Sequence, residues 1–257
     1  MSKVFAVVIF LSAFLLFLVQ PLIARIILPW FGGTSAVWTT CLVFFQITLL
    51  LGYLYAYGLA GRSPVRRQAV VHMLVLASSL LALPILPGEW WKHTGTSQPA
   101  LRILGLLAGT VGLPYFTLSS TGPLLQAWYS RLHAGRIPYR LYALSNAGSL
   151  LALLSYPVVV EPMLRASSQS IVWSCGYGLF VLCAGAISFA MFRSATDHAP
   201  LIDDGPRPTV REHFLWIALA ACPSALLLAV TNHLTQNIAP IPLLWVVPLA
   251  IYLFTLI

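Results

Sequence analysis

Eight long apolar stretches constrain this chain more than any other feature of its sequence. A helix needs roughly 20 apolar residues to cross the hydrocarbon core of a bilayer, and backbone polar groups in lipid must be satisfied internally. The stretches are too long and too uninterrupted for barrel strands, so they predict an all-α fold, a polytopic transmembrane helix bundle of about eight spans. They cover residues 4–28, 35–59, 68–86, 101–129, 139–160, 170–192, 214–231 and 241–257.

The composition excludes a water-soluble globule. Of the 257 residues, 59% are hydrophobic and only 8% are charged, whereas soluble domains carry about 25% charged residues. No small-x-small cleavage site follows the first stretch, which favours a retained first helix over a signal peptide. The four cysteines lie inside apolar stretches, where thiols pack as small hydrophobes, so we expect neither a disulfide framework nor a metal site.

The basic residues predict the orientation of the bundle. If the N-terminus is cytoplasmic, ten Lys and Arg residues lie inside and four lie outside, as the positive-inside rule requires. This bias accounts for the net charge of +8. We therefore expect the lipid bilayer as a partner and no nucleic acid. We expect "GEWWKH" to lie at the outer membrane interface and "QAWYSRLH" to form an aromatic belt and basic edge at the inner one.

A polar segment at 193–213 divides the chain. It holds three prolines and four of the six acidic residues, which is typical of a flexible linker. We therefore expect a six-helix membrane block at 1–192, a cytoplasmic linker and two further transmembrane helices at 214–257. Six helices and a linker would begin a duplicated transporter. "LLFLVQPLIARIILP" and "LLLAVTNHLTQNIAP" match weakly at one fixed offset, so a repeat and a chance match both stay open.

Polar residues inside apolar stretches mark the candidate site, because such residues are costly in lipid and usually functional. Our hypothesis is that they converge on one internal face between the two helical blocks. Alternatives stay open, since Arg25 could extend to the outer headgroups, His233 lies in a polar run that could cap a helix, and Asn146 could bond a neighbouring helix. The substrate-facing candidates are Gln20, Arg25, Tyr142, Asn146, Asn232 and His233.

Two further patterns concern helix shape and packing. Pro114 and Pro123 bracket the hydroxyls of "PYFTLSSTGP", which indicates either a kinked helix with re-satisfied carbonyls or a broken helix lining a cavity. Small residues recur at Ser145, Gly148, Ala152 and Ser155, a spacing that lets a neighbouring helix approach closely.

Four segments carry a family resemblance. "FLSAFLLFLVQPLIARIILPWFGGTSAVWTT", "GLPYFTLSSTGPLLQAWYS", "PYRLYALSNAGSLLALLSYPVVVEP" and "PLLWVVPLAIYLFTLI" resemble the membrane region of bacterial fused major-facilitator-like and spermidine-synthase-like proteins. The resemblance covers nearly the whole chain, and "YRLYALSNAG" is its most specific part. It implies a multi-pass protein of the bacterial cell inner membrane, normally followed by more helices and by a cytosolic domain of the aminopropyltransferase type.

The residues themselves offer no catalytic site. No G-x-G-x-x-G turn and no paired-carboxylate arrangement occurs, so we expect neither a cofactor nor enzymatic activity of this chain. A helix of n residues is about 1.5n Å long, so 241–257 falls short of the roughly 30 Å core, which predicts an incomplete module.

Three functions stay open. The chain could be a transporter-like module for a small polar or cationic solute. It could be a membrane anchor or regulator of a synthase-like domain, or a structural subunit of a membrane complex.

Overall fold

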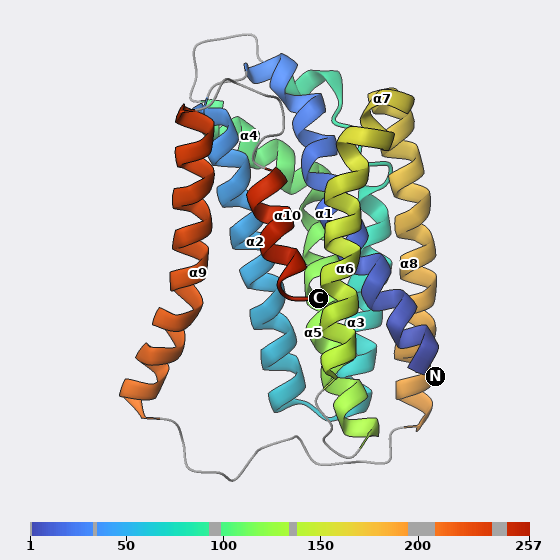
Figure 1. The fold of residues 1–257 in the computed structure, drawn as a ribbon. Coiled ribbons are helices and arrows are strands. Elements are labelled where there is room, and N and C mark those ends of the chain that lie inside the picture. Colours follow the sequence, from blue (N-terminus) through green and yellow to red (C-terminus); the bar gives the residue numbers. More distant parts are fainter. Residues whose placement is uncertain (1, 33–34, 93–98, 134–137, 195–208, 238–245) are drawn as a thin grey trace.

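The computed structural model describes residues 2–32, 35–92, 99–133, 138–194, 209–237 and 246–257 (Figure 1). Within these ranges every regular element is helical, which confirms the all-α polytopic bundle. The elements are α1 (Ser2–Phe31), α2 (Ser35–Arg62), α3 (Val65–Ser79), η1 (Leu80–Ala82), η2 (Glu89–Trp91), α4 (Pro99–Leu107), η3 (Ala108–Gly112), α5 (Leu113–Leu132), α6 (Tyr139–Ser155), η4 (Tyr156–Val160), α7 (Glu161–Met163), α8 (Ala166–Ser194), α9 (Val210–Asn237) and α10 (Val246–Phe254).

Seven helical segments in the described residues are long and apolar enough to cross a membrane, one fewer than the sequence predicts. The expected eighth span, 241–257, falls partly outside the described residues and partly on α10, which has nine residues. The expected linker at 193–213 falls largely outside them as well. On either side of it, α8 ends at Ser194 and α9 begins at Val210.

Two spans contain a π-helical turn next to a proline and continue as helix past it. The π-helical turn η3 comes just before Pro114, and the π turn η4 contains Pro157. A proline removes one backbone donor and clashes with the preceding turn, which a π bulge accommodates. Thr117 Oγ1 donates to Leu113 O at 2.8 Å, and Thr121 Oγ1 donates to Thr117 O at 2.6 Å. These carbonyls are not the ones that the prolines leave without a backbone donor. The helix continues through Pro123, so the segment is not broken, although Ser119, Gly122 and Pro123 line the cavity described below.

The first helix is the centre of the bundle. α1 packs against α5, α6 and α8, while α2 packs on α5 and α3 on α8 (Figure 1). Buried aromatic residues connect these helices by hydrogen bonds as well as by the apolar surface that they bury. Trp173 Nε1 donates to Leu15 O at 2.9 Å, and the Tyr177 hydroxyl donates to Ser79 Oγ at 2.6 Å. Such bonds stabilise membrane bundles by about 0.6–2 kcal/mol each.

The predicted small-residue stripe is confirmed at its central glycine. A Cβ atom placed on Gly148 of α6 would lie 2.7 Å from the carbonyl oxygen of Phe10 in α1. Ala152, one turn further, is fully buried. The absence of a side chain at Gly148 therefore sets the distance between α1 and α6, as small residues do in membrane bundles.

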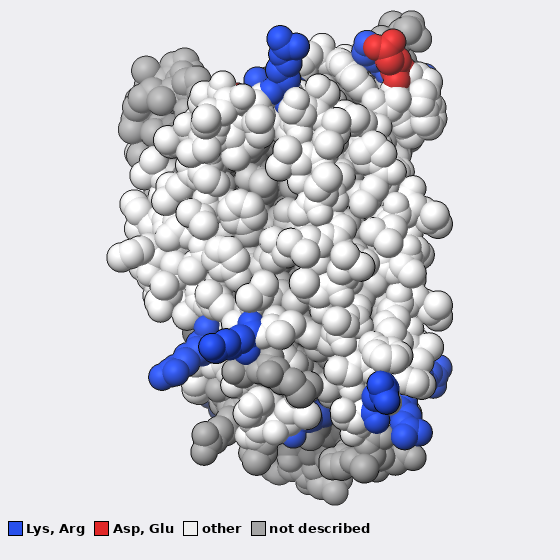
Figure 2. Space-filling model, turned by 90° about the vertical axis from the view of Figure 1, so that its right-hand side faces the viewer, with Lys and Arg blue, Asp and Glu red and all other residues white. Residues whose placement is uncertain are grey.

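Charged side chains gather at the two ends of the bundle and leave an apolar band between them (Figure 2). At the end opposite the N-terminus, Lys92 Nζ lies 2.6 Å from Glu89 Oε1, and this hydrogen bond holds the pKa of the Glu89 carboxyl below its usual value. Trp90 is 79% exposed there, as expected for a membrane interface. The interpretation of "QAWYSRLH" as an aromatic belt is wrong for Trp128, which is fully buried and donates to Gln68 Oε1 at 2.7 Å.

α9 stands at the edge of the bundle and makes its main contact with α10 (Figure 1). Its first turn is closed by a capping box, in which Thr209 N donates to Glu212 Oε2 at 2.7 Å and Glu212 N donates to Thr209 Oγ1 at 3.3 Å. None of the residues in its apolar window is buried, whereas α1 is the most buried span. The two helices aligned as a repeat thus occupy different environments.

Candidate functional site

A cavity of about 770 Å³ lies between α1, α2, α5, α6 and α10, and we call it the central cavity. It occupies the second half of α2 and the first half of α6, and therefore the part of the bundle nearer the N-terminal end. Its polar lining residues are Ser12, Gln20, Tyr53, Tyr57, Tyr115, Ser119, Gln126, Arg131, Tyr142, Ser145, Asn146, Ser149 and Tyr252.

The inner wall is built by α1 and α5. Gln20 Nε2 donates to the hydroxyl of Tyr115 at 3.2 Å, and Tyr115 is buried. Ser12 and Ser119 also line this wall, but their hydroxyls bond carbonyls of their own helices, Ile9 O and Phe116 O, both at 2.9 Å. The wall therefore presents a paired amide and phenol together with hydroxyl oxygens that can still accept hydrogen bonds.

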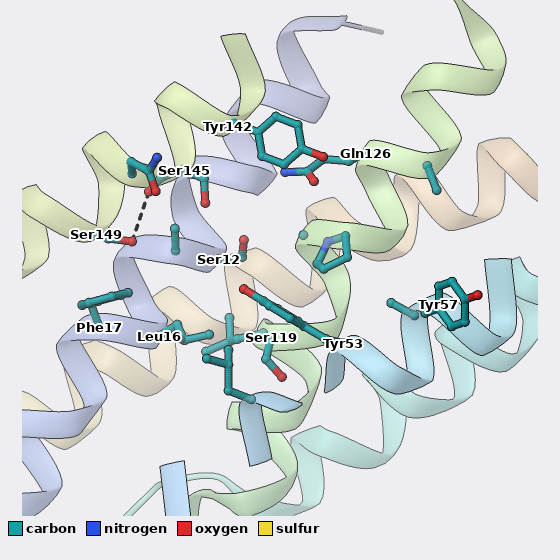
Figure 3. A pocket seen from close by; sticks show the side chains of 18 of the residues that line it. Ser12, Leu16, Phe17, Tyr53, Tyr57, Ser119, Gln126, Tyr142, Ser145 and Ser149 are labelled. Atoms are coloured by element: carbon teal, nitrogen blue, oxygen red, sulfur yellow. Dashed lines mark hydrogen bonds between the residues drawn. The ribbon is translucent and has the colours of Figure 1, made fainter. Parts of the chain in front are cut away.

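A second wall joins α6 to the end of the chain. Asn146 Nδ2 donates to Leu256 O at 3.2 Å, and Ser149 Oγ donates to Ser145 O at 3.1 Å (Figure 3). α10 packs against α6 and contributes Leu253 to the lining. Asn146 thus serves a helix contact, one of the alternatives for this residue, while its side chain also lines the cavity.

Six polar side chains of the cavity have no hydrogen-bond partner among the described residues. They are the phenols of Tyr53, Tyr57, Tyr142 and Tyr252, the amide of Gln126 and the hydroxyl of Ser145. In Figure 3 the Tyr142 ring and the Gln126 amide point toward one another, and the Tyr53 hydroxyl points toward Ser12. Tyr53 is 50% and Tyr142 47% exposed, so these groups are accessible from the cavity and can donate to a polar occupant.

The charge of the lining is one-sided. Arg131, in the last turn of α5, is the one charged residue among the described lining residues. They carry no carboxylate, imidazole or thiol. The cavity can therefore bind by hydrogen bonding and by one positive charge, and its described side chains supply no nucleophile of the Cys–His type and no carboxylate acid or base.

The structure brings three of the predicted site residues together. Gln20, Tyr142 and Asn146 line the central cavity from α1 and α6. Arg25 does not line it, because it donates from Nη1 to Glu161 O at 2.9 Å and to Leu164 O at 3.4 Å near the opposite end of the bundle. His233 is exposed on α9, which stands apart from this cavity. The side chain of Asn232 lies outside the described residues.

The sequence reasoning missed the contributions of α2 and α5. Tyr53 and Tyr57 are four residues apart in "GYLYAYG", so they share one helix face, and this spacing could have marked them. Gln126 and Arg131 were assigned to a membrane interface because they lie near a helix end. Depth along a helix does not reveal which neighbour a side chain faces.

A second buried polar cluster lies between α2, α3 and α5. His72 is fully buried and its Nε2 lies 3.1 Å from Thr121 Oγ1, while Nδ1 has no partner among the described residues. The Tyr55 hydroxyl is likewise buried without a partner, and its ring lies 6.2 Å from the imidazole. None of these side chains lines the central cavity. We therefore assign them to helix packing.

Comparison of the chain with models of protein families, with curated proteins and with solved structures found no match. The resemblance to the fused spermidine-synthase-like proteins therefore stays a prediction. Among the described residues no group of three His, Cys, Asp or Glu side chains could hold a metal ion.

Proposed function

We propose that this chain is a transporter-like membrane module that binds a small polar solute in the central cavity. The observation that carries the proposal is the cavity itself, about 770 Å³ in volume and lined by polar side chains within an apolar bundle. Binding sites for small ligands measure roughly 300–1,000 Å³ and combine apolar walls with a few polar groups. Transporter sites of this kind lie within the membrane, between helical blocks.

The unpartnered donors support an occupied cavity over a structural void. Tyr53, Gln126 and Tyr142 come from three different helices and meet at one cavity. Polar groups in a membrane span are costly, and they commonly mark the path of a solute or ion. A membrane anchor for a cytosolic synthase-like domain, or a structural subunit, would need no such cavity.

The proposed orientation places the N-terminal end of the bundle in the cytoplasm of a bacterial cell, with the module in the inner membrane. The cavity then reaches the cytoplasmic side, because Arg131 lies in the last turn of α5. A cytosolic domain of the type that the resemblance implies would act on the same side.

Cysteine labelling tests the cavity directly. In a cysteine-free background, Gln126→Cys should react with a hydrophilic maleimide, because water and solute would reach this position. Leu50→Cys is the matched control, since Leu50 is 57% exposed on the lipid-facing side of α2 and does not line the cavity.

Protection then identifies the solute. A fractionated extract of small bacterial metabolites should slow the labelling of Gln126→Cys, and the protecting solute should enter proteoliposomes that contain the protein. If no fraction slows the labelling of Gln126→Cys, the binding proposal is contradicted. Protection without uptake would restrict the function to binding.

A further inference from the structure

Arg131 distinguishes the central cavity from a neutral polar pocket. Its side chain is half-buried in the last turn of α5, at the N-terminal end of the bundle. Arg140 lies near the same end but is exposed and does not line the cavity. A basic residue that only sets topology would reach water or headgroups as Arg140 does. Arg131 instead points back into the bundle.

The guanidinium of Arg131 is only partly satisfied. Nη2 donates to Ala60 O, near the end of α2, at 2.6 Å. Nε and Nη1 are buried and have no hydrogen-bond partner among the described residues. No carboxylate of the described lining neutralises the charge. Removing a cation from water costs free energy unless a counter-charge pairs with it. Leaving such a charge unpaired costs more than losing one hydrogen bond between neutral groups.

The surrounding donors point the same way. Gln126 and Tyr142 line the cavity with Arg131 and offer an amide and a phenol without protein partners among the described residues. Oxyanions accept several such bonds at once, and charge-assisted bonds from arginine are the strongest of them. A cationic solute would find a positive charge and no described carboxylate in the same lining.

We infer that the solute of the central cavity is anionic, a small carboxylate or phosphate whose charge is held by Arg131. The inference rests on the proposed function and narrows its substrate class. A lipid phosphate and a soluble anion share this chemistry, and Arg131 lies near a membrane edge. The experiment therefore separates the two sources.

The first measurement is a ligand series on the unaltered 257-residue chain in nanodiscs of neutral phosphatidylcholine. Succinate, citrate, inorganic phosphate and glycerol phosphate are compared with the uncharged analogues succinamide and glycerol and with the diamine putrescine. We expect at least one anion, and neither its uncharged analogue nor the diamine, to raise the thermal unfolding midpoint with saturation. Stabilisation by succinamide, glycerol or putrescine in place of the anions would overturn the inference while leaving the proposed solute site intact.

The second measurement is the Arg131→Gln variant with Arg140→Gln as the matched control. Loss of a charge-assisted contact should weaken binding of the anion about tenfold or more in Arg131→Gln, and Arg140→Gln should bind as the parent chain does. Arg131→Lys keeps the charge and should retain part of the affinity, and it replaces the glutamine variant if that variant does not fold. Equal affinity in all of these variants would overturn the role of Arg131.

The lipid arm repeats the series in nanodiscs that contain phosphatidylglycerol. If the occupant is a lipid headgroup, phosphatidylglycerol should raise the unfolding midpoint of the parent chain but not that of Arg131→Gln. Soluble anions should then have no further effect on the midpoint. If the occupant is a soluble anion, that anion should still raise the midpoint in the presence of phosphatidylglycerol. No saturable effect of any solute or anionic lipid would refute both the anionic site and the proposed function. A neutral or cationic ligand that protects Gln126→Cys would refute the anionic site alone.

Discussion

Trp128 and Gln68 together connect three helices by hydrogen bonds. The indole N–H of Trp128 donates to Gln68 Oε1 at 2.7 Å, which links α5 to α3. The amide of Gln68 in turn donates to Ser63 O at 2.6 Å and to Ala60 O at 3.3 Å, at the end of α2. Because Arg131 bonds the same Ala60 carbonyl, this cluster also holds one edge of the central cavity.

Replacing Trp128 by phenylalanine should therefore destabilise the bundle. The Trp128→Phe variant leaves Gln68 Oε1 without a donor, at a cost of about 0.6–2 kcal/mol for an interhelical bond in a membrane protein. Unfolding in mixed micelles of increasing denaturing detergent would measure the loss. Trp90→Phe is the control, since Trp90 is 79% exposed and the change should stay within about 0.5 kcal/mol. Equal stability of both variants would argue against the assigned role of Trp128.

The same residues mark how far sequence reasoning reaches at this scale. Gln20, Tyr142 and Asn146 were found because a polar group in an apolar stretch is costly wherever it faces, and all three line the cavity. Arg131 and Trp128 were assigned to the membrane interface from their place near a helix end. Whether such a residue turns outward or inward depends on the neighbouring helices, which the local sequence does not encode.

At the scale of elements, the contact between α1 and α6 depends on a missing side chain. A Cβ on Gly148 would lie 2.7 Å from Phe10 O and 3.3 Å from the Phe10 ring, so the two helices would have to separate. Gly185 of α8 offers the opposite case, because nothing lies within 4 Å of a Cβ placed there.

Gly148→Ala should consequently destabilise the protein by about 1–3 kcal/mol, the usual cost of overpacking. Gly185→Ala should leave stability unchanged or raise it slightly, because alanine is the better helix former. The same detergent titration would compare the two variants. A Gly148→Ala variant as stable as Gly185→Ala would mean that α1 and α6 can separate at no cost.

The length of a transmembrane helix was predictable where the length of the apolar stretch alone determines it. The stretch at 35–59 became α2 and that at 170–192 lies within α8, because a span must match the thickness of the bilayer. The π turns η3 and η4 were not predicted, since a proline indicates a kink but does not specify which bulge relieves it. The environment of α9 was not predictable either, because its neighbours are set by tertiary packing.

For the molecule as a whole, the distribution of basic residues determines which side of the membrane each end should occupy. Eight described Lys and Arg residues lie at the end that holds the N-terminus and four at the other end (Figures 1 and 2). The first group is Lys3, Arg62, Arg66, Arg67, Arg131, Arg140, Arg193 and Arg211, and the second is Arg25, Lys92, Arg102 and Arg165.

This asymmetry predicts a cytoplasmic N-terminus, and the two ends of one span test it. Tyr139 is 70% exposed at the start of α6, and Met163 is 76% exposed at the end of α7, so both positions should accept a label. In a cysteine-free background of intact bacterial cells, Met163→Cys should react with a membrane-impermeant maleimide, and Tyr139→Cys should react only after permeabilisation. The reverse pattern would invert the bundle, and the central cavity, which lies nearer the N-terminal end, would then face the outside.

Because the positive-inside rule acts through residues close to the span ends, replacing Arg66, Arg67 and Arg140 together by glutamine should increase the labelling of Tyr139→Cys in intact cells, whereas replacing Arg102 and Arg165 should not.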